Sequence, residues 1–318
     1  MTIFDRQHTT GTQQPDFAAV LDQIAAEMQP LIGQGKVADY IPHLAKVPAN
    51  RFGMALATLD GRMYSVGDAR EPFSIQSISK VFTLTLALEA LGSELWQRVG
   101  REPSGNAFNS LVQLEREDGI PRNPFINGGA HVIADVVLSQ YPDALERLLS
   151  FVRERADNSG IQMDPAVALS ERATGFRNAA LANFIRSFGN LHNPVEAVLD
   201  FYYRQCSLRL DCEDLARSML YLADRGRCHR TNTAVISADR AKRINALMLT
   251  CGTYDAAGEF AFRVGLPAKS GVGGGIVAIV PGVLSVAVWS PGLDEKGNSL
   301  AGAAALDRFT SITGLSVF

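Results

Sequence analysis

The strongest constraint in this sequence is a lysine at the head of an apolar run. Residues 81–91 are mostly leucine, alanine, valine and phenylalanine, and they leave no polar stripe, so they predict a helix that is buried nearly all round. An unpaired ammonium in such a setting is costly, so Lys80 must have close partners or lose its proton. The run therefore predicts a core helix with a chemically unusual lysine at its start.

A serine, Ser77, stands three residues before this lysine. In a helix, positions i and i+3 lie on one face, so the hydroxyl would be within reach of the amine. A hydroxyl is a weak nucleophile at its free pKa, and a desolvated lysine can take its proton. The pair therefore indicates a serine nucleophile with a lysine base. S-x-x-K alone is a weak pattern, because a capping serine followed by a solvated lysine gives the same spacing.

Composition excludes several classes of protein. The 318-residue chain has a net charge of -3 and a pI near 6.0, which gives no electrostatic footprint for nucleic acid or an anionic membrane. The first residues are polar and lack the apolar region of a secretory signal. No apolar segment is long enough to span a membrane. We therefore expect a cytoplasmic protein. The cysteines lack C-x-x-C spacing and the histidines are scattered, so we expect no metal site and no cofactor.

The order of the expected elements predicts an α/β (α+β) fold with an antiparallel sheet flanked by helices. Strands are expected at 52–59, 63–66, 276–280 and 283–289, with tight turns at Asp60-Gly61 and Pro281-Gly282. Helices are expected at 16–31, 77–91, 127–139, 142–156, 171–187, 193–206, 212–225, 238–249 and 297–312. Residues 16–91 and 237–318 would form a discontinuous α/β domain and residues 92–236 a helical domain, with the active site at their interface. Residues 1–15 are expected to be disordered.

Several polar residues beside these elements are candidate pocket residues. Asn127 lies where a loop runs into a helix, and by itself it is more simply a helix cap. Glu171 and Asn178 are seven residues apart and would project from one side of the helix expected at 171–187, which is by default a solvated face. Tyr40 could face a pocket or pack as an ordinary aromatic residue. The pattern alone leaves these alternatives open.

The chain resembles the serine hydrolases of the penicillin-binding and β-lactamase superfamily in three features. These features are S-x-x-K at the head of a buried helix, a helical insertion, and a late Lys-Ser-Gly before an edge strand. Within that group the chain resembles the serine-dependent glutaminases of bacteria, over nearly everything after residue 16. The segments that carry the resemblance are 40–45, 73–80, 123–127, 170–171 with Asn178, Tyr202 with 205–207, 251–255 and 269–275.

The resemblance implies a β-lactamase/transpeptidase-like fold and hydrolysis of the side-chain amide of L-glutamine to L-glutamate and ammonia, without a cofactor. It implies Ser77 as the nucleophile, Lys80 as its base, and Tyr254 as the relay of a proton to the leaving ammonia. The backbone amides of Ser77 and Val272 would form the oxyanion hole. It also implies a homo-oligomer, either a dimer or a tetramer.

The remaining pocket residues would hold the amino-acid end of the substrate. A carboxylate such as Glu171 suits the α-ammonium, and amide or phenol donors suit the α-carboxylate. The resemblance gives these donors as Asn127, Asn178 and Tyr202, with Tyr40 closing the pocket.

Three features of the chain raise specific questions. Gly128 stands where the family more often has alanine, a change that we expect to loosen the loop beside a substrate asparagine. Tyr203 follows Tyr202. If the expected orientation of the helix were wrong by one residue, Tyr203 and not Tyr202 would face the pocket. Lys269 matches the second lysine of the superfamily, and we expect its charge to help keep Lys80 neutral.

Two other functions share part of this pattern. A β-lactam-recognising hydrolase or transpeptidase would share the S-x-x-K and Lys-Ser-Gly elements, although its substrates lie outside the cytoplasm and no clear S-D-N element is present. A non-catalytic amino-acid-binding module would keep the pocket without the chemistry. The intact Ser77, Lys80 and Tyr254 argue against that second alternative.

Overall fold

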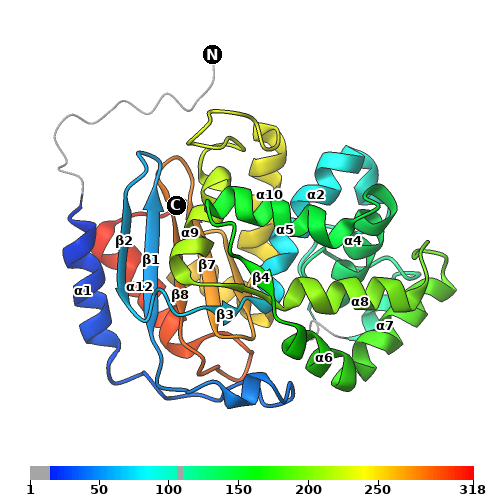
Figure 1. The fold of residues 1–318 in the computed structure, drawn as a ribbon, viewed down its shortest axis with the longest axis horizontal. Coiled ribbons are helices and arrows are strands. Elements are labelled where there is room, and N and C mark those ends of the chain that lie inside the picture. The colour runs from blue at the N-terminus through cyan, green and yellow to red at the C-terminus, as the bar shows by residue number, and fades with distance from the viewer. Residues whose placement is uncertain (1–14, 106–109) are drawn as a thin grey trace.

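The computed structural model describes residues 15–105 and 110–318. The disorder expected for residues 1–15 therefore falls, apart from Pro15, outside the described residues. A sheet lies on one side of the molecule and a group of helices on the other (Figure 1). Within the described ranges, no helix is both long and apolar enough to cross a bilayer.

The described elements mix strands and helices, and the predicted α/β (α+β) class is confirmed. The strands are β1 (Gly53–Thr58), β2 (Met63–Gly67), β3 (Phe73–Ser74), β4 (Gln162–Met163), β5 (Leu208–Leu210), β6 (Ala268–Gly271), β7 (Gly275–Val280) and β8 (Leu284–Trp289). The α-helices are α1 (Phe17–Met28), α2 (Ser79–Leu91), α3 (Leu111–Arg116), α4 (Asn127–Gln140), α5 (Ala144–Ala156), α6 (Pro165–Thr174), α7 (Phe176–Ser187), α8 (Val195–Cys206), α9 (Cys212–Ala223), α10 (Ala238–Cys251), α11 (Ala257–Arg263) and α12 (Leu300–Thr313). The 3₁₀ turns are η1 (Leu44–Lys46), η2 (Gln76–Ile78), η3 (Gly92–Gln97) and η4 (Tyr254–Ala256).

The main sheet is antiparallel and runs in the order β2-β1-β8-β7-β6. Its β1–β2 and β7–β8 pairs are the two hairpins expected from the sequence. Every residue of β1, β7 and β8 is buried, because helices cover both faces of the sheet. Successive side chains point to opposite faces, so Met54 and Leu56 enter one core while Ala55 and Ala57 enter the other.

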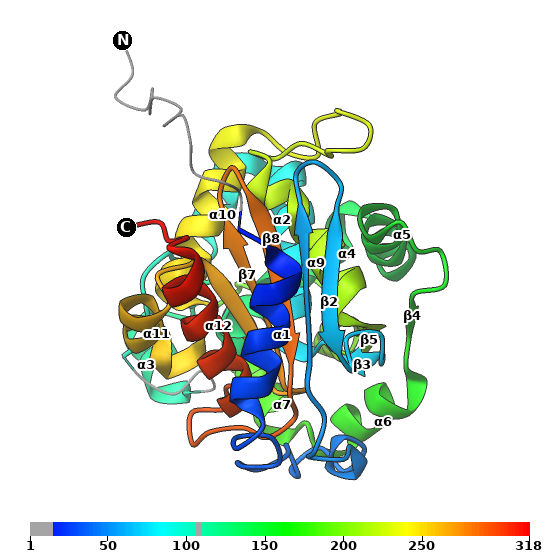
Figure 2. The same cartoon turned by 90° about the vertical axis from the view of Figure 1, so that its left-hand side faces the viewer.

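Helices α1 and α12 pack against each other and cover one face of the sheet (Figure 2). Helix α9 packs against β1 and β8 on the opposite face. The sequence predicted this helix within the inserted helical domain, whereas its contacts join it directly to the sheet. The two-domain division itself stays a prediction. All four cysteines lie in the described part of the chain, where each is free and buried.

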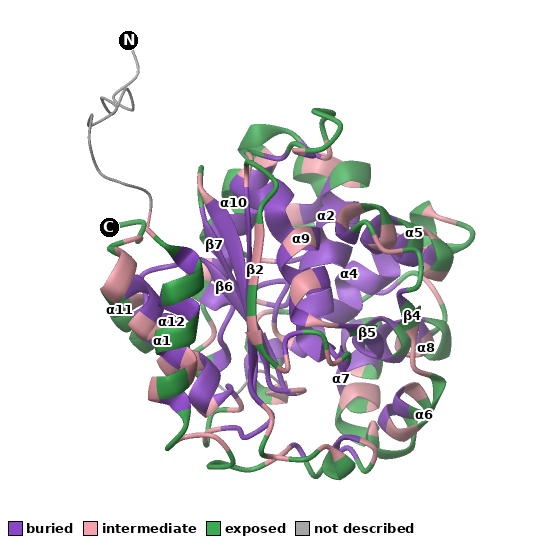
Figure 3. Ribbon diagram, turned by 60° about the vertical axis from the view of Figure 1, so that its left-hand side comes forward, coloured by how far each residue is buried: buried purple, intermediate pink, exposed green. Residues whose placement is uncertain are grey.

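The helix that leads away from the serine is buried as predicted. In α2, residues 79–88 are all buried, and Figure 3 shows α2 and α9 among the buried elements between the sheet and the outer helices. The helix begins at Ser79, so Ser77 lies in the preceding turn η2 and not in α2 itself. A small second sheet, β3-β5-β4, lies directly before this turn.

The single helix predicted at 171–187 is wrong, because the chain forms two helices there. Gly175 ends α6 and is also the N-terminal cap of α7. A Cβ atom at Gly175 would lie 2.0 Å from the Tyr203 hydroxyl. Close packing against α8 therefore requires a glycine at this break.

Candidate active site

One cavity of about 240 Å³ gathers residues from distant parts of the chain. This volume lies below the roughly 300 to 1,000 Å³ typical of pockets for drug-sized ligands, so it suits a small molecule. Every predicted site residue lines the cavity except Lys80, which lies behind it. The predicted residues in the lining are Tyr40, Ser77, Asn127, Glu171, Asn178, Tyr202, Tyr254 and Val272.

Two residues of the cavity have strained backbones. Gln76, directly before Ser77, has a φ of 50°, and Tyr254 has a φ of 55°. This left-handed region is uncommon for residues with a side chain. Such strain persists only where the surrounding structure fixes the backbone, and it concentrates at functional sites.

Strand β6 and the turn after it lie unusually close to the chain that leads into η2. A Cβ atom at Gly271 would lie 2.3 Å from the carbonyl oxygen of Ile75, and one at Gly273 would lie 2.1 Å from that of Ser74. Only glycine fits at these two positions without a backbone shift. This approach brings Val272, between the two glycines, into the wall of the cavity.

Lys80 is fully buried, with 1% of its surface exposed. Its Nζ donates hydrogen bonds to the Phe125 carbonyl at 3.0 Å and to Asn127 Oδ1 at 2.8 Å. Burial lowers the pKa of Lys80 to about 8, although nearby acidic groups oppose this shift. In the described part of the chain no hydrogen bond joins Lys80 to Ser77, so the pairing of this hydroxyl with this amine stays a prediction.

Asn127 continues this hydrogen-bond chain into the cavity. Its Nδ2 donates to Asn178 Oδ1 at 2.9 Å, which leaves the amide N–H groups of Asn178 as donors for a ligand. Asn127 does not cap α4, because the cap position is Ile126. The simpler explanation of this asparagine as a helix cap is therefore wrong.

Glu171 is a buried carboxylate, with 7% of its surface exposed. Burial raises its pKa to about 7, and a hydrogen bond with Gln76 and the charge of Lys80 oppose the rise. Among the described residues Glu171 forms no ion pair at salt-bridge distance. A solvated helix face is thus excluded for Glu171, and a perturbed carboxylate in a cavity is a candidate partner for a cationic ligand group.

Helix α8 directs Tyr202 to the cavity and Tyr203 away from it. Tyr202 is 3% exposed and lines the cavity. The buried His131 packs against its ring at 4.7 Å between centroids and an angle of 88°. The Tyr203 hydroxyl instead donates to the Gly175 carbonyl at 3.3 Å. Of the two neighbouring tyrosines, the cavity therefore contains Tyr202.

The other two tyrosines of the cavity differ in exposure. Tyr254 is buried, and burial raises the pKa of its phenol, while hydrogen bonds with Ser77, Ser270 and the Val272 amide oppose the rise. Tyr40 is 57% exposed and also lines the cavity. This combination gives the site one phenol in contact with the serine and one exposed ring at its edge.

Lys269 lies behind Tyr254, with its Nζ 4.6 Å from the ring centroid. It donates to the carbonyls of Gly252 at 2.8 Å and Ser270 at 2.6 Å. Burial, and then the charge of Lys80, lower the pKa of Lys269 well below its ordinary value. Burial is the largest cause of the lowered pKa of Lys80, and the expected effect of Lys269 on Lys80 stays a prediction.

The cavity also contains residues that the sequence analysis did not select. These residues are Ile41, Gln76, Thr174, Gly175 and Arg177. Gln76 and Arg177 could have been found, because each is the direct neighbour of a selected residue. Thr174 and Gly175 enter the cavity only because the chain breaks between α6 and α7.

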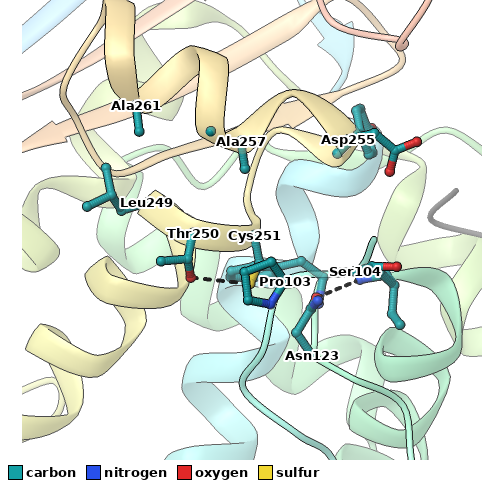
Figure 4. Close-up of a pocket in the computed structure, with 13 residues that line it drawn as sticks. Pro103, Ser104, Asn123, Leu249, Thr250, Cys251, Asp255, Ala257 and Ala261 are labelled. Carbon is teal, nitrogen blue, oxygen red and sulfur yellow. Dashed lines mark hydrogen bonds between the residues drawn. The ribbon is translucent and has the colours of Figure 1, made fainter. Parts of the chain in front are cut away.

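A neighbouring cavity of about 380 Å³ shares only Tyr254 with the first one. Asn123, Thr250 and Cys251 lie in its wall (Figure 4). The Thr250 hydroxyl and the Cys251 thiol are 3.3 Å apart. The other predicted site residues are absent from this lining, so we assign the candidate active site to the smaller cavity.

Comparisons with known proteins identify the family of the chain. The family profile described as Glutaminase matches residues 35–318. A glutaminase from Rhizobium rhizogenes is 61% identical over 305 residues, which are 95% of this chain and 99% of the relative. A glutaminase from Ralstonia nicotianae is 57% identical over 303 residues, 95% of this chain and 100% of the relative.

Solved structures give the same result. The probable glutaminase from Bacillus subtilis complexed with 6-diazo-5-oxo-L-norleucine has a TM-score of 0.87 and 34% identity, covering 97% of this chain and 99% of that chain. Another structure of a probable glutaminase from Bacillus subtilis has a TM-score of 0.88 at 34% identity, covering 96% of this chain and 99% of that chain. From the fold, the cavity and these similarities together, the chain belongs to the glutaminase family.

Proposed function

We propose that this glutaminase hydrolyses the side-chain amide of L-glutamine to L-glutamate and ammonia through an acyl-enzyme on Ser77. The observation that carries the proposal is one small cavity in which Ser77, Tyr254 and Glu171 meet, with the buried amine of Lys80 behind them. The relatives named glutaminase support the choice of glutamine.

The two ends of the cavity suit the two ends of glutamine. Glu171, when ionised, offers a charged acceptor to the α-ammonium. Asn178 offers amide N–H groups to the α-carboxylate, and Tyr202 and Asn127 lie beside it. Tyr40, the exposed ring, would close the cavity over the bound amino acid.

The hydrogen bonds of Lys80 suit a base that is neutral before the reaction. A neutral amine has two N–H groups and one lone pair, and both N–H groups are used by Phe125 and Asn127. The lone pair remains to accept the Ser77 proton as the Ser77 oxygen bonds to the amide carbon. This transfer requires the two side chains to approach, because catalytic contacts are often long before substrate binds.

The backbone amides of Ser77 and Val272 would stabilise the tetrahedral oxyanion. Each such donor usually lowers the activation free energy by roughly 3 to 4 kcal/mol. Tyr254 then passes the proton from Lys80 to the amide nitrogen, the C–N bond breaks and ammonia leaves. Water adds to the acyl carbon and gives its proton to Lys80. The Ser77 ester bond breaks, Ser77 regains its proton, and L-glutamate is released.

The family match favours this reaction over both alternatives. Rapid turnover of a chromogenic cephalosporin, or a stable acyl adduct with it, would instead support a β-lactam-recognising hydrolase or transpeptidase. A lack of ammonia release from glutamine would instead support a non-catalytic amino-acid-binding module. The cytoplasmic location and the homo-oligomeric state, dimer or tetramer, stay predictions from the sequence.

The proposal is tested by ammonia release from glutamine compared with asparagine. Ser77→Ala should abolish turnover, while calorimetry still detects glutamine binding because Glu171 and Asn178 remain. Ser150→Ala, which removes an exposed hydroxyl outside the cavity, is the control and should keep turnover. Peptide mass spectrometry after treatment with 6-diazo-5-oxo-L-norleucine should find the label on Ser77. More than residual turnover in Ser77→Ala, or a label on another residue, would overturn the assignment.

A further inference from the structure

The cavity of the candidate active site contains an arginine that the proposed reaction leaves without a role. Arg177 lines this cavity and is exposed. An exposed residue in the lining lies where the cavity opens to solvent. Arg177 also directly precedes Asn178, which is proposed to hold the α-carboxylate of glutamine, so a guanidinium is available at that end of the cavity.

The charges of the lining match a zwitterion only when Arg177 is included. Among the described residues of the lining, Glu171 is the carboxylate and Arg177 the cation. Free glutamine carries one α-ammonium and one α-carboxylate, and Glu171 is assigned to the ammonium. The donors assigned to the carboxylate are all uncharged, and they are Asn127, Asn178 and Tyr202. Moving a carboxylate out of water is costly unless an opposite charge accompanies it.

Lys80 does not supply this opposite charge. It lies behind the cavity, and its Nζ donates to the Phe125 carbonyl and to Asn127 Oδ1. As the proposed base, Lys80 is also neutral when the substrate binds. A cation for the α-carboxylate must therefore come from the lining itself.

The side chain of Arg177 is available to a ligand, unlike those of two nearby arginines. Helices α6 and α7 both pack against α8 (Figure 1), and Arg172 of α6 and Arg204 of α8 both pair with Asp200. Within residues 15–105 and 110–318, the Arg177 side chain forms no hydrogen bond, ion pair or ring contact. A guanidinium can bind a carboxylate through two parallel hydrogen bonds. Substrate binding would thus give this side chain a partner without breaking another contact.

The start of α7 presents Arg177 and Asn178 together. Both residues lie in the first turn of the helix, and both line the cavity. The amide N–H groups of Asn178 are available because its Oδ1 accepts from Asn127. We propose that Arg177 binds the α-carboxylate of glutamine together with Asn178, and that it makes the site select ligands with a free α-carboxylate. This inference rests on the proposed function, since it takes glutamine as the ligand.

The test compares glutamine with L-glutaminamide, in which an amide replaces the α-carboxylate. Both are titrated calorimetrically into the full chain carrying Ser77→Ala, so that turnover does not consume them. Adding Arg177→Gln should weaken glutamine binding about tenfold or more, through the loss of one charged contact. It should leave the binding of L-glutaminamide within about twofold. The preference for glutamine should therefore fall, which a general loss of packing would not produce.

Arg204→Gln is the matched control. Arg204 is exposed and lies outside the cavity, and its removal leaves Asp200 paired with Arg172, so the binding of both ligands should be unchanged. Thermal unfolding of each variant checks that the fold is kept. With Ser77 intact, Arg177→Gln should raise the KM for glutamine about tenfold and keep kcat within about twofold, because the lost contact is made equally in the ground state and the transition state.

Three results would overturn the inference. They are an unchanged glutamine affinity in Arg177→Gln, an equal loss for both ligands, and the same loss in Arg204→Gln. Absence of glutamine binding to the Ser77→Ala chain would overturn it as well. Ammonia release by the unmodified chain is measured separately. Failure of the inference therefore leaves the proposed reaction untouched, and failure of the reaction with intact binding leaves the inference standing.

Discussion

The pH dependence of kcat/KM is the most direct test of the two perturbed groups in the candidate active site. Lys80 must be neutral to accept a proton, and its pKa is about 8. Glu171 must be charged to bind an ammonium, and its pKa is about 7. Raising the pH deprotonates both groups, so both act in the same direction. We therefore expect kcat/KM to rise with pH and to reach a plateau above the pKa of Lys80.

The size of this effect follows from the two pKa values. At pH 7 about one tenth of Lys80 is neutral and about half of Glu171 is charged, so kcat/KM should be about one twentieth of its plateau. On a logarithmic plot the slope should be about 2 below pH 7 and about 1 between pH 7 and pH 8. The assay is initial-rate ammonia release at low glutamine concentration, from about pH 5.5 to about pH 9.

Glu171→Gln separates the two groups. The variant should lose affinity for glutamine, seen as a raised KM, because the ammonium loses its charged partner. Its pH profile should retain a single limb of slope about 1. The charge of Glu171 raises the pKa of Lys80, so this limb should lie at a lower pH than the Lys80 limb of the unmodified chain. A flat profile in the unmodified chain, an upward shift in the variant or an unchanged KM would refute the reasoning.

Two further predictions concern α4. Asn127→Asp places a carboxylate where Asn127 Oδ1 now lies 2.8 Å from Lys80 Nζ, so the pKa of Lys80 should rise by about 1 to 3 and kcat at pH 8 should fall by about fivefold to about 500-fold. An unchanged pH profile would contradict this. Gly128→Ala, whose Cβ would meet its nearest atom at 3.4 Å, should stabilise the chain to urea by about 0.5 to 1 kcal/mol. Gly129→Ala, whose Cβ would lie 1.9 Å from the Asn123 carbonyl oxygen, should destabilise it by more than about 1 kcal/mol. Equal unfolding midpoints for the two alanine variants would contradict the packing argument.

The sequence predicted the elements that depend on local patterns. The turn at Asp60-Gly61 between two expected strands was enough for the β1–β2 hairpin, and the apolar run after Lys80 was enough for the buried helix α2. The family motifs brought together the residues that line the cavity. The hairpin and helix patterns lie within a few residues of the features that they predict, whereas the family motifs are spread along the chain.

Contacts across the chain were outside the reach of such patterns. The spacing of Ser77 and Lys80 predicted a direct contact, yet the Lys80 amine bonds Phe125 and Asn127, which are 45 and 47 residues away. The break at Gly175 depends on the Tyr203 hydroxyl packing against it. Local spacing gives the face of a helix, but only tertiary packing decides which partner meets that face.

The two buried lysines show how one environment gives two different roles. Burial lowers the pKa of Lys80 and Lys269, and the charge of Lys80 lowers that of Lys269 further. The Nζ of Lys269 donates hydrogen bonds to the carbonyls of Gly252 and Ser270. These carbonyls lie on the two segments that carry Tyr254 and Val272.

The second segment is tied to the first by another buried contact. Ser270 Oγ bonds Asn298 Oδ1 at 2.6 Å, and Asn298 Nδ2 donates to the Thr253 carbonyl at 3.2 Å. Hydrogen bonds to the Gly252 and Thr253 carbonyls therefore hold the backbone directly before Tyr254, whose φ is an uncommon 55°. Among the described residues, the burial of Lys269 is thus matched by hydrogen bonds to two carbonyls and not by an ion pair, and these bonds hold the two segments together.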